Sequence, residues 1–418
     1  MRFLKLTSAT LTIAGLLSAC SDGAPPASAG ETIVATTTTV RPDDGELLIG
    51  AILPRSGVAA DLGSSISDAL ALAVSEINAA GGVGGRPVRI IEREEGDNEA
   101  TASLAALELV ELGVDAIIGP TSSTNTLATL GTAVDAGVLT CSPTATALAL
   151  DSFPDNGLFI RTIASDSLQA EALASLVESS GTSSAVIVYV DDNYGRPFAQ
   201  KTRLAALAEG TSVTAMVGFT ASEDSMASAV DAVVAAEAEV VVVIADGMTG
   251  PEIISAIDDA SNLSPTFVIN DAIRRPATSA PPFSRSLITR IEGVSPLAYP
   301  TSDSFMDSLR SINPATTGLF AQNGYDCINA ISIAALSAGS DQPAAIARQI
   351  PIVTDQGTPC SNFSTCAASL AAGRQIDYSG PGRDLTIGPD GEVLNAFFER
   401  FTFDADGRDV AAGLVPVG

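Results

Sequence analysis

The chain combines short, continuous apolar runs with longer segments in which apolar residues recur every three to four positions. Residues 47–53, LLIGAIL, form such a run, whereas residues 64–79 carry Ile66, Leu70 and Ile77 at helical spacing. A continuous run is typical of a strand buried on both faces, and the second spacing places apolar side chains on one face of a helix. The pattern therefore predicts strands that alternate with helices.

This alternation occurs twice along the chain. The first half predicts strands at 47–53, 88–93, 114–118 and 138–141, with helices at 64–79, 98–112 and 122–136. The second half predicts strands at 185–190, 213–219, 239–245 and 266–269, with helices at 167–178, 195–208, 225–236 and 251–260. Helices that connect consecutive strands favour parallel pairing. We therefore expect an α/β protein with two similar halves, each a parallel sheet flanked by helices.

The N-terminal residues predict export and attachment to a membrane. Residues 1–19 contain Arg2 and Lys5 and then an apolar run that is too short for a permanent membrane span, which is typical of a signal peptide. The run ends in LSAC and resembles a bacterial lipobox, in which Cys20 becomes the lipidated first residue; the alternative is a plain signal peptide with cleavage nearby. Residues 20–46, rich in Ser, Thr, Ala and Pro, are predicted to be the lipidated cysteine and a flexible tether.

The composition excludes several classes of chemistry. The formal net charge is −28, the chain has no His and no Trp, and Lys occurs only at Lys5 and Lys201. Without His there is no Ser-His or Cys-His dyad and no HExxH zinc motif, and no Gly is followed by Lys as a phosphate-binding loop requires. An acidic surface also repels nucleic acid and anionic membranes. We therefore predict a protein that is not an enzyme and binds no metal, cofactor or nucleic acid.

Polar residues gather where the predicted strands end, which is the edge at which open parallel sheets bind ligands. The clusters are Ser122-Ser123, Thr144–Thr146, Asp191–Tyr194, Asp246-Gly247 and Asn270-Asp271. Hydroxyl groups and free N–H groups at a helix start suit a carboxylate, and the later acids suit an ammonium group, so together they predict a zwitterionic ligand. The alternative is that Ser122 and Ser123 only cap a helix, and that each acid only caps the helix or turn after it.

Four cysteines follow the leader, and an even number in an exported chain favours disulfides. Cys360 and Cys366 flank the short segment SNFST and are predicted to pair. For Cys141 and Cys327 two interpretations remain open, a disulfide or two buried thiols.

From residue 47 to near its C-terminus, the sequence resembles the branched-chain amino-acid binding proteins of bacterial ABC transporters, which have the type I periplasmic-binding-protein fold. The similarity is carried, in this order, by IGAILPRSG, ALAVSEINAAGGVGGRPV, IIGPTSSTNT, LTCSPTATA, FIRTIASD, VDDNYGRPFA and FDADG. The segment CSNFSTC, residues 360–366, is similar to a disulfide-bearing variant in actinobacterial members.

The resemblance implies two lobes joined by a three-strand hinge, with residues 47–164 and 298–392 in lobe 1 and residues 165–297 and 393–418 in lobe 2. It implies a ligand carboxylate on the first lobe and a ligand ammonium held by the second. The implied site residues are Ser122, Ser123, Thr144, Ala145 and Thr146 on the first lobe, with Tyr194 across the cleft and Asp271 as the acid.

Two departures from the family pattern occur, one in the first loop and one in a loop of the second lobe. Leu62 stands where many relatives have an aromatic residue, and it packs either on an apolar ligand or in the core. The loop Arg274-Arg275-Pro276 either pairs with nearby acids or faces an acidic ligand.

We therefore expect a monomeric, lipid-anchored solute-binding protein on the outer face of the cytoplasmic membrane, which delivers an amino acid to an ABC permease. The alternatives are a surface sensor on the same fold, or a binder of a urea, amide or aromatic-acid solute.

Overall fold

The computed structural model describes residues 43–274, 283–381 and 384–418, which all belong to one compact unit, residues 38–418. The predicted signal peptide, the tether up to residue 42 and the lipidation site Cys20 lie outside the described residues. These three assignments therefore stay predictions.

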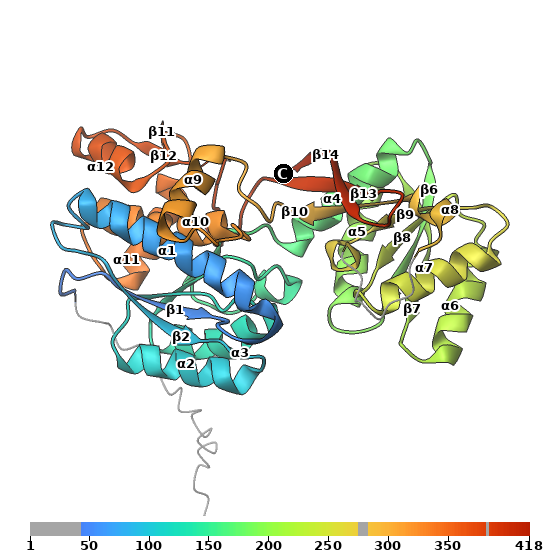
Figure 1. The fold of residues 1–418 in the computed structure, drawn as a ribbon, viewed down its shortest axis with the longest axis horizontal. Coiled ribbons are helices and arrows are strands. Elements are labelled where there is room, and N and C mark those ends of the chain that lie inside the picture. Colours follow the sequence, from blue (N-terminus) through green and yellow to red (C-terminus); the bar gives the residue numbers. More distant parts are fainter. Residues whose placement is uncertain (1–42, 275–282, 382–383) are drawn as a thin grey trace, which may run out of the picture. The chain divides into compact units, whose positions relative to one another are not determined.

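The first half of the chain forms a five-stranded parallel sheet with the order β2-β1-β3-β4-β5 (Figure 1). The strands are β1 (Leu48–Leu53), β2 (Arg89–Glu94), β3 (Ala116–Ile118), β4 (Leu139–Ser142) and β5 (Phe159–Arg161). The first four confirm the predicted strands, whereas β5 is too short to give a periodic signal. Five of the six residues of β1 are buried, as the continuous apolar run at 47–53 predicts for a central strand.

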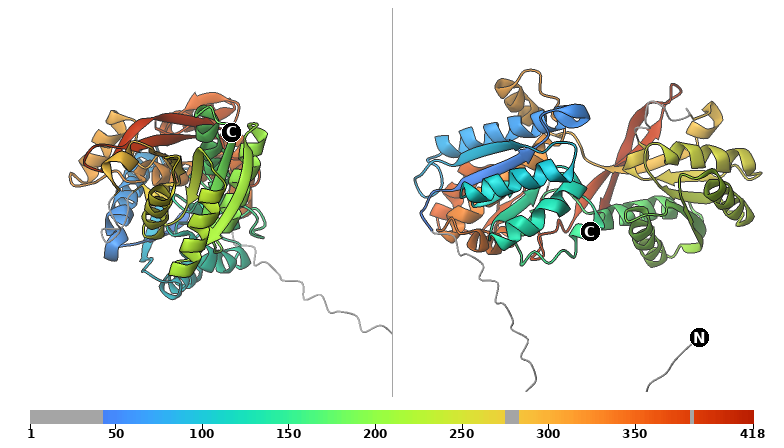
Figure 2. Two further views of the ribbon diagram at one scale, coloured as in Figure 1. Left: turned by 90° about the vertical axis from the view of Figure 1, so that its right-hand side faces the viewer. Right: turned by 90° about the horizontal axis from the view of Figure 1, so that it is seen from below.

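Helices cover both faces of this sheet. The apolar stripe of α1 (Ala60–Ala79) packs with α10 (Ala321–Ala338) and α11 (Pro343–Val353) in one core cluster. On the other face, α2 (Glu99–Glu111) and α3 (Ser123–Asp135) form a second cluster. The right-hand view of Figure 2 shows these layers, with α1 in blue on one side of the strands and the cyan helices on the other.

Helix α1 and the turn before it, Gly57–Ala79, have the length and mean hydropathy, 1.3, of a membrane span. However, Ile66, Leu70 and Ile77 are fully buried against the rest of the protein, so α1 is a core helix. Leu62 also packs against this core, which supports the second of its two interpretations.

The second sheet has seven strands in the order β14-β13-β10-β9-β8-β6-β7. It contains β6 (Ser184–Val190), β7 (Ser212–Phe219), β8 (Val240–Ile244), β9 (Thr266–Ile269), β10 (Ile291–Pro296), β13 (Ala396–Phe403) and β14 (Asp409–Val417). Its flanking helices are α4 (Asp166–Ser179), α5 (Gly195–Ala208), α6 (Glu223–Ala235), α7 (Thr249–Ala260) and the short α8 (Arg285–Ile288). The predicted strands and helices of the second half are confirmed within a few residues.

Strands β13 and β14 extend the parallel part of this sheet in the antiparallel direction, which the sequence pattern did not predict. Residues 404–408 connect the two strands by a tight turn, closed by a hydrogen bond from the N–H of Asp404 to the O of Arg408. A turn this short can join only antiparallel neighbours.

The chain passes between the two sheets three times, through a first crossing at residues 162–165, a second at 297–302 and a third at 391–395. A small cavity touches all three crossings, at Ile163, Leu297 and Asn395, so they lie side by side. Between the second and third crossings lie α9 (Asp303–Ile312), α10, α11, α12 (Phe363–Ala371) and the strand pair β11 (Thr358–Cys360) and β12 (Ile376–Tyr378). In Figure 1 the orange helices α10 and α11 return to the five-stranded sheet.

Candidate ligand-binding site

The turn between β3 and α3 requires glycine at its first position. Gly119 has a φ of +93°, and a Cβ atom there would collide with the carbonyl oxygen of Ile52 in β1. The turn then leads to Ser122, which is the N-cap of α3 and accepts a hydrogen bond from the N–H of Asn125 at 3.5 Å. The capping interpretation of Ser122 is therefore confirmed.

A buried acid that the sequence analysis missed occupies much of this turn. The carboxylate of Glu95, which follows β2, accepts hydrogen bonds from the backbone N–H of Thr121 at 2.8 Å and of Ser122 at 3.0 Å. It also accepts from the Thr121 hydroxyl and the Asn125 amide. These N–H groups belong to the helix start that was predicted to bind a ligand carboxylate. The only local signal was the acidic stretch Glu94-Glu95-Gly96-Asp97 at a strand end.

The donors left for a ligand lie one residue further along. Ser123 and Thr124 are the first two residues of α3, whose N–H groups have no partner inside the helix. Within the described part of the chain, no hydrogen bond occupies either N–H group. The Ser123 hydroxyl accepts a hydrogen bond from the N–H of Ala147 at 3.3 Å, which ties α3 to the loop after β4.

A cavity of about 350 Å³ opens beside these groups. Its wall comes from the start of α3, the loop after β4, the first residue of α4 and the loop before α5, and thus from elements of both sheets. The lining residues are Ser123, Thr124, Leu127, Thr146, Ala147, Leu148, Ala149, Asp166, Asn193, Tyr194 and Pro197. We call it the central cavity. A larger cavity, about 660 Å³, also adjoins the start of α3 and is lined by Glu95, Ser122 and Thr124 among others.

Three of the predicted site residues, Ser123, Thr146 and Tyr194, line the central cavity together. Two others hold the loop in place instead. The Thr144 hydroxyl donates to the O of Thr121 at 2.8 Å, and the N–H of the buried Ala145 donates to the Ser142 hydroxyl at 3.0 Å.

Asp271, the predicted partner of the ligand ammonium, is half-buried and accepts a hydrogen bond from the Gln169 amide at 2.8 Å. It does not line the central cavity. Burial raises the pKa of Asp271 above its ordinary value. Nearby, the Tyr194 hydroxyl accepts a hydrogen bond from the Asn270 amide at 3.0 Å, which fixes the ring at the cavity wall.

Asp166 is the acid that does line the central cavity, and the sequence analysis did not assign it. It is the first residue of α4, and its N–H donates to the O of Thr146 at 2.9 Å. Burial, and next the charge of Asp271, raise the pKa of Asp166 well above its ordinary value. The signal available in the sequence was the motif FIRTIASD, which ends in this residue.

The remaining candidates have partners within the protein. Asp191 pairs with Arg196, and Asp246 accepts from the N–H groups of Met248 and Thr249, both at 2.7 Å, in the turn that leads into α7. Arg274 pairs with Glu399 and Asp409, both at 2.7 Å, so its ion-pair interpretation is confirmed. Arg275 and Pro276 lie outside the described residues.

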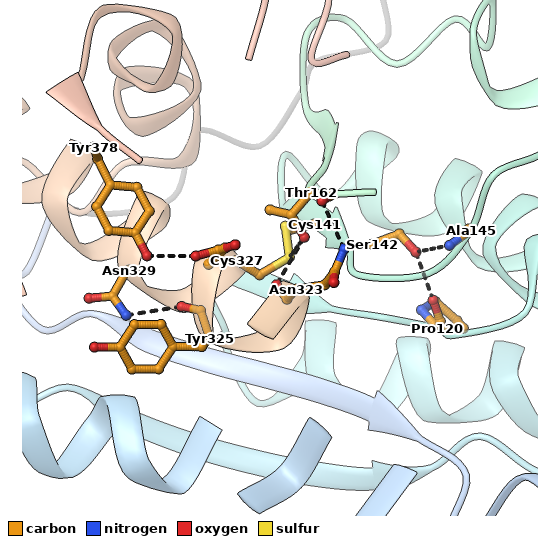
Figure 3. Close-up of a disulfide and its surroundings, with 11 residues drawn as sticks. Pro120, Cys141, Ser142, Ala145, Thr162, Asn323, Tyr325, Cys327, Asn329 and Tyr378 are labelled. Carbon is orange, nitrogen blue, oxygen red and sulfur yellow. Dashed lines mark hydrogen bonds between the residues drawn. A yellow bond between two sulfur atoms is a disulfide. The ribbon is translucent and has the colours of Figure 1, made fainter. Parts of the chain in front are cut away.

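Both disulfides are present, and one supports the site. Cys141 in β4 is bonded to Cys327 in α10, which resolves the open alternative, and Cys360 is bonded to Cys366 as predicted. Figure 3 shows that the first disulfide lies beside Ser142, whose hydroxyl donates to the O of Pro120 at 3.1 Å. The same figure shows Thr162 of the first crossing and Asn323 of α10 joined by two hydrogen bonds of 2.9 Å.

Two α/β sheets, three crossings and a polar cavity at the strand ends are the architecture of a two-lobed solute-binding protein. The model of the periplasmic binding protein family matches residues 46–395, and the chain therefore belongs to that family.

Individual relatives are similar to different extents. The chain is 25% identical to Leu/Ile/Val-binding protein homolog 3 of Brucella melitensis, over 84% of this chain and 93% of that protein. It is 30% identical to Leu/Ile/Val-binding protein BraC3 of Rhizobium johnstonii, over 35% of this chain and only 40% of that protein. Among solved structures, an ABC transporter substrate-binding protein from Desulfitobacterium hafniense in complex with Leu has a TM-score of 0.66 and 20% identity. That match covers 88% of this chain and all of the other, and it shows the shared fold.

Proposed function

We propose that this protein binds a free amino acid, with branched-chain amino acids as the first candidates, and delivers it to an ABC permease from a lipid anchor outside the cytoplasmic membrane. One observation carries the proposal. The two sides of the central cavity have opposite chemistry, with the first N–H groups of α3 at Ser123 and Thr124 on one side and the Asp166 carboxylate on the other.

This arrangement matches a zwitterion. The free N–H groups and the positive end of a helix dipole favour the ligand carboxylate. The Asp166 carboxylate favours the ammonium group, and Asp271 adds negative charge behind it. Leu127, Leu148 and Pro197 supply apolar wall for a hydrocarbon side chain. The volume of about 350 Å³ is at the small end of ligand sites, which span roughly 300–1,000 Å³.

The relatives support the same ligand class. The Brucella protein is named for leucine, isoleucine and valine, and the Desulfitobacterium structure holds Leu. Membrane anchoring at Cys20, export and delivery to a permease are supported by the lipobox and by the family. Contacts from both lobes to one ligand would stabilise the closed state over the open state.

Isothermal titration calorimetry of the mature protein against the twenty common amino acids tests this proposal. We expect at least one amino acid to bind with micromolar or tighter affinity. Replacing Ser123 by Ala removes a hydroxyl at the cavity wall and is expected to weaken binding about tenfold, or about 1.4 kcal/mol. Thr132→Ala, about two and a half turns further along α3 and outside the cavity, is the matched control and should change little. If no amino acid binds more tightly than millimolar, the proposed ligand class is wrong.

A further inference from the structure

Arg161, the last residue of β5, is fully buried although it carries a charge. One of its terminal nitrogens, Nη1, donates to the O of Ala145 at 3.1 Å and to the O of Ala147 at 3.4 Å. These carbonyl groups flank Thr146, which lines the central cavity. The guanidinium group therefore holds the backbone on both sides of a cavity residue.

The other two nitrogens of Arg161 reach acids in different parts of the chain. Nη2 forms an ion pair with Asp151, and Asp151 in turn accepts hydrogen bonds from the Ser165 hydroxyl at 2.8 and 3.0 Å. Ser165 is the N-cap of α4 and so sets the position of Asp166, the cavity acid. Through Asp151, Arg161 thus acts on the second side of the cavity as well.

The third nitrogen connects Arg161 to the third crossing. Nε donates to the Glu392 carboxylate at 2.6 Å, and the backbone N–H of Arg161 donates to the O of Gly391 at 3.0 Å. Residues 391–395 lead directly into β13 of the seven-stranded sheet. Arg161 itself is followed at once by the first crossing, where Thr162 is bonded to Asn323. One side chain is therefore bonded to the cavity loop and to the segment that leads from the five-stranded half into β13 of the other sheet.

A buried guanidinium with two carboxylates is costly to desolvate, and its removal leaves unpaired charges. Its planar fork can serve two carbonyl groups and two acids at fixed angles, which the single ammonium of Lys cannot do. If Arg161 served only the stability of the fold, its partners would not have to lie in the cavity loop and beside a crossing.

We propose that Arg161 is a positioning residue of the ligand site, which holds Thr146 and Asp166 in their binding arrangement and couples that arrangement to the third crossing through Glu392. The predicted effect of Arg161 on ligand affinity rests on the proposed function. The predicted effect of Arg161 on the unliganded protein does not depend on the ligand class.

The first test needs no ligand. Amide hydrogen exchange is measured on the mature protein and on Arg161→Lys, which keeps the charge but loses the fork. The control is Arg274→Lys, because Arg274 also pairs with two carboxylates, Glu399 and Asp409, but lies outside the central cavity. We expect the N–H groups of Ala147 and Asp166 and those of residues 391–395 to exchange at least tenfold faster in Arg161→Lys and at the wild-type rate in Arg274→Lys.

The second test is the affinity for L-leucine by calorimetry. We expect Arg161→Lys to weaken binding at least tenfold and Arg274→Lys to change it less than twofold. Glu392→Gln, which keeps the size of the side chain and removes its charge, tests the coupling if Arg161→Lys does not fold, and should accelerate exchange at Ala147 and Asp166.

Equal effects of the Arg161 and Arg274 variants on exchange would overturn the inference, because they would show a general loss of stability. Unchanged exchange at Ala147 and Asp166 in Glu392→Gln would overturn the coupling. If the wild-type protein binds no amino acid, the proposed function fails, whereas the exchange data still decide the role of Arg161.

Discussion

The carboxylate of Glu95 accepts hydrogen bonds from both the backbone N–H and the hydroxyl of Thr121, at 2.8 and 2.7 Å. The turn before α3 is thus neutralised by an acid of the protein itself, which is 1% exposed. A second anion at the same N–H groups would meet this carboxylate, so we expect a ligand carboxylate to bind at the next N–H groups, at Ser123 and Thr124.

Glu95→Gln is expected to destabilise the protein and weaken ligand binding. The Gln side chain has one acceptor oxygen, and its NH₂ group would face N–H donors of the turn, so about 2–3 kcal/mol of unfolding free energy should be lost. Chemical denaturation measures this loss. The control is Glu94→Gln, since Glu94 lies at the same strand end but is only half-buried and bonds to N–H groups outside the α3 turn. Equal losses in both variants would contradict the role of Glu95.

Affinity for an amino acid is expected to rise with pH. Because the pKa of Asp166 is raised well above its ordinary value, by burial first and then by the charge of Asp271, this carboxyl group keeps its proton to a higher pH than an ordinary Asp. An ammonium group binds the ionised form better, so ligand binding expels the proton and strengthens as pH increases towards the raised pKa. The groups that face Asp166 include Arg161, which opposes the shift, and Asp151, which adds to it.

Calorimetry between pH 5 and pH 8 measures this dependence. Asp166→Asn should lower the affinity about tenfold or more and remove most of the slope. Asp246→Asn, in the turn before α7 and outside the central cavity, should leave the slope intact. A flat profile in the wild-type protein, or one that falls with pH, would argue against the role of Asp166.

The two disulfides should contribute unequally to stability. Cys141 and Cys327 are 186 residues apart, whereas Cys360 and Cys366 are only 6 apart. In the chain-entropy account, the longer loop corresponds to about 5 kcal/mol and the shorter to about 2 kcal/mol. Denaturation of the paired variants Cys141→Ala/Cys327→Ala and Cys360→Ala/Cys366→Ala measures the difference.

Ligand affinity adds a second comparison between these variants. Only the first disulfide adjoins a site loop, at Ser142, so we expect only the first pair of substitutions to weaken binding. A larger loss of stability from the short-loop pair would contradict the expected order.

Local features of the sequence were sufficient to predict most of the strands and helices. The apolar run at 47–53, the stripe of α1 and the Ser122 cap depend on neighbours within a few residues, so each is visible as a pattern. The same holds for the hydroxyl residues Ser123 and Thr146, which follow strand ends and share the central cavity. The antiparallel strands β13 and β14 were missed, because pairing direction depends on where a returning chain enters the sheet.

The assignment of each acid was decided only by the tertiary structure. Glu95 and Asp166 were not separable by pattern from the other acids of a chain with a net charge of −28. Glu95 reaches Thr121 over 26 residues, and Glu392 reaches Arg161 over 231. Burial and charge pairing depend on which distant segments meet, whereas periodicity records only the local surroundings of each residue. The sequence by itself therefore determined the type and order of most elements and the hydroxyl side of the cavity, and the folded chain decided which carboxylates line the cavity and which are bonded within the protein.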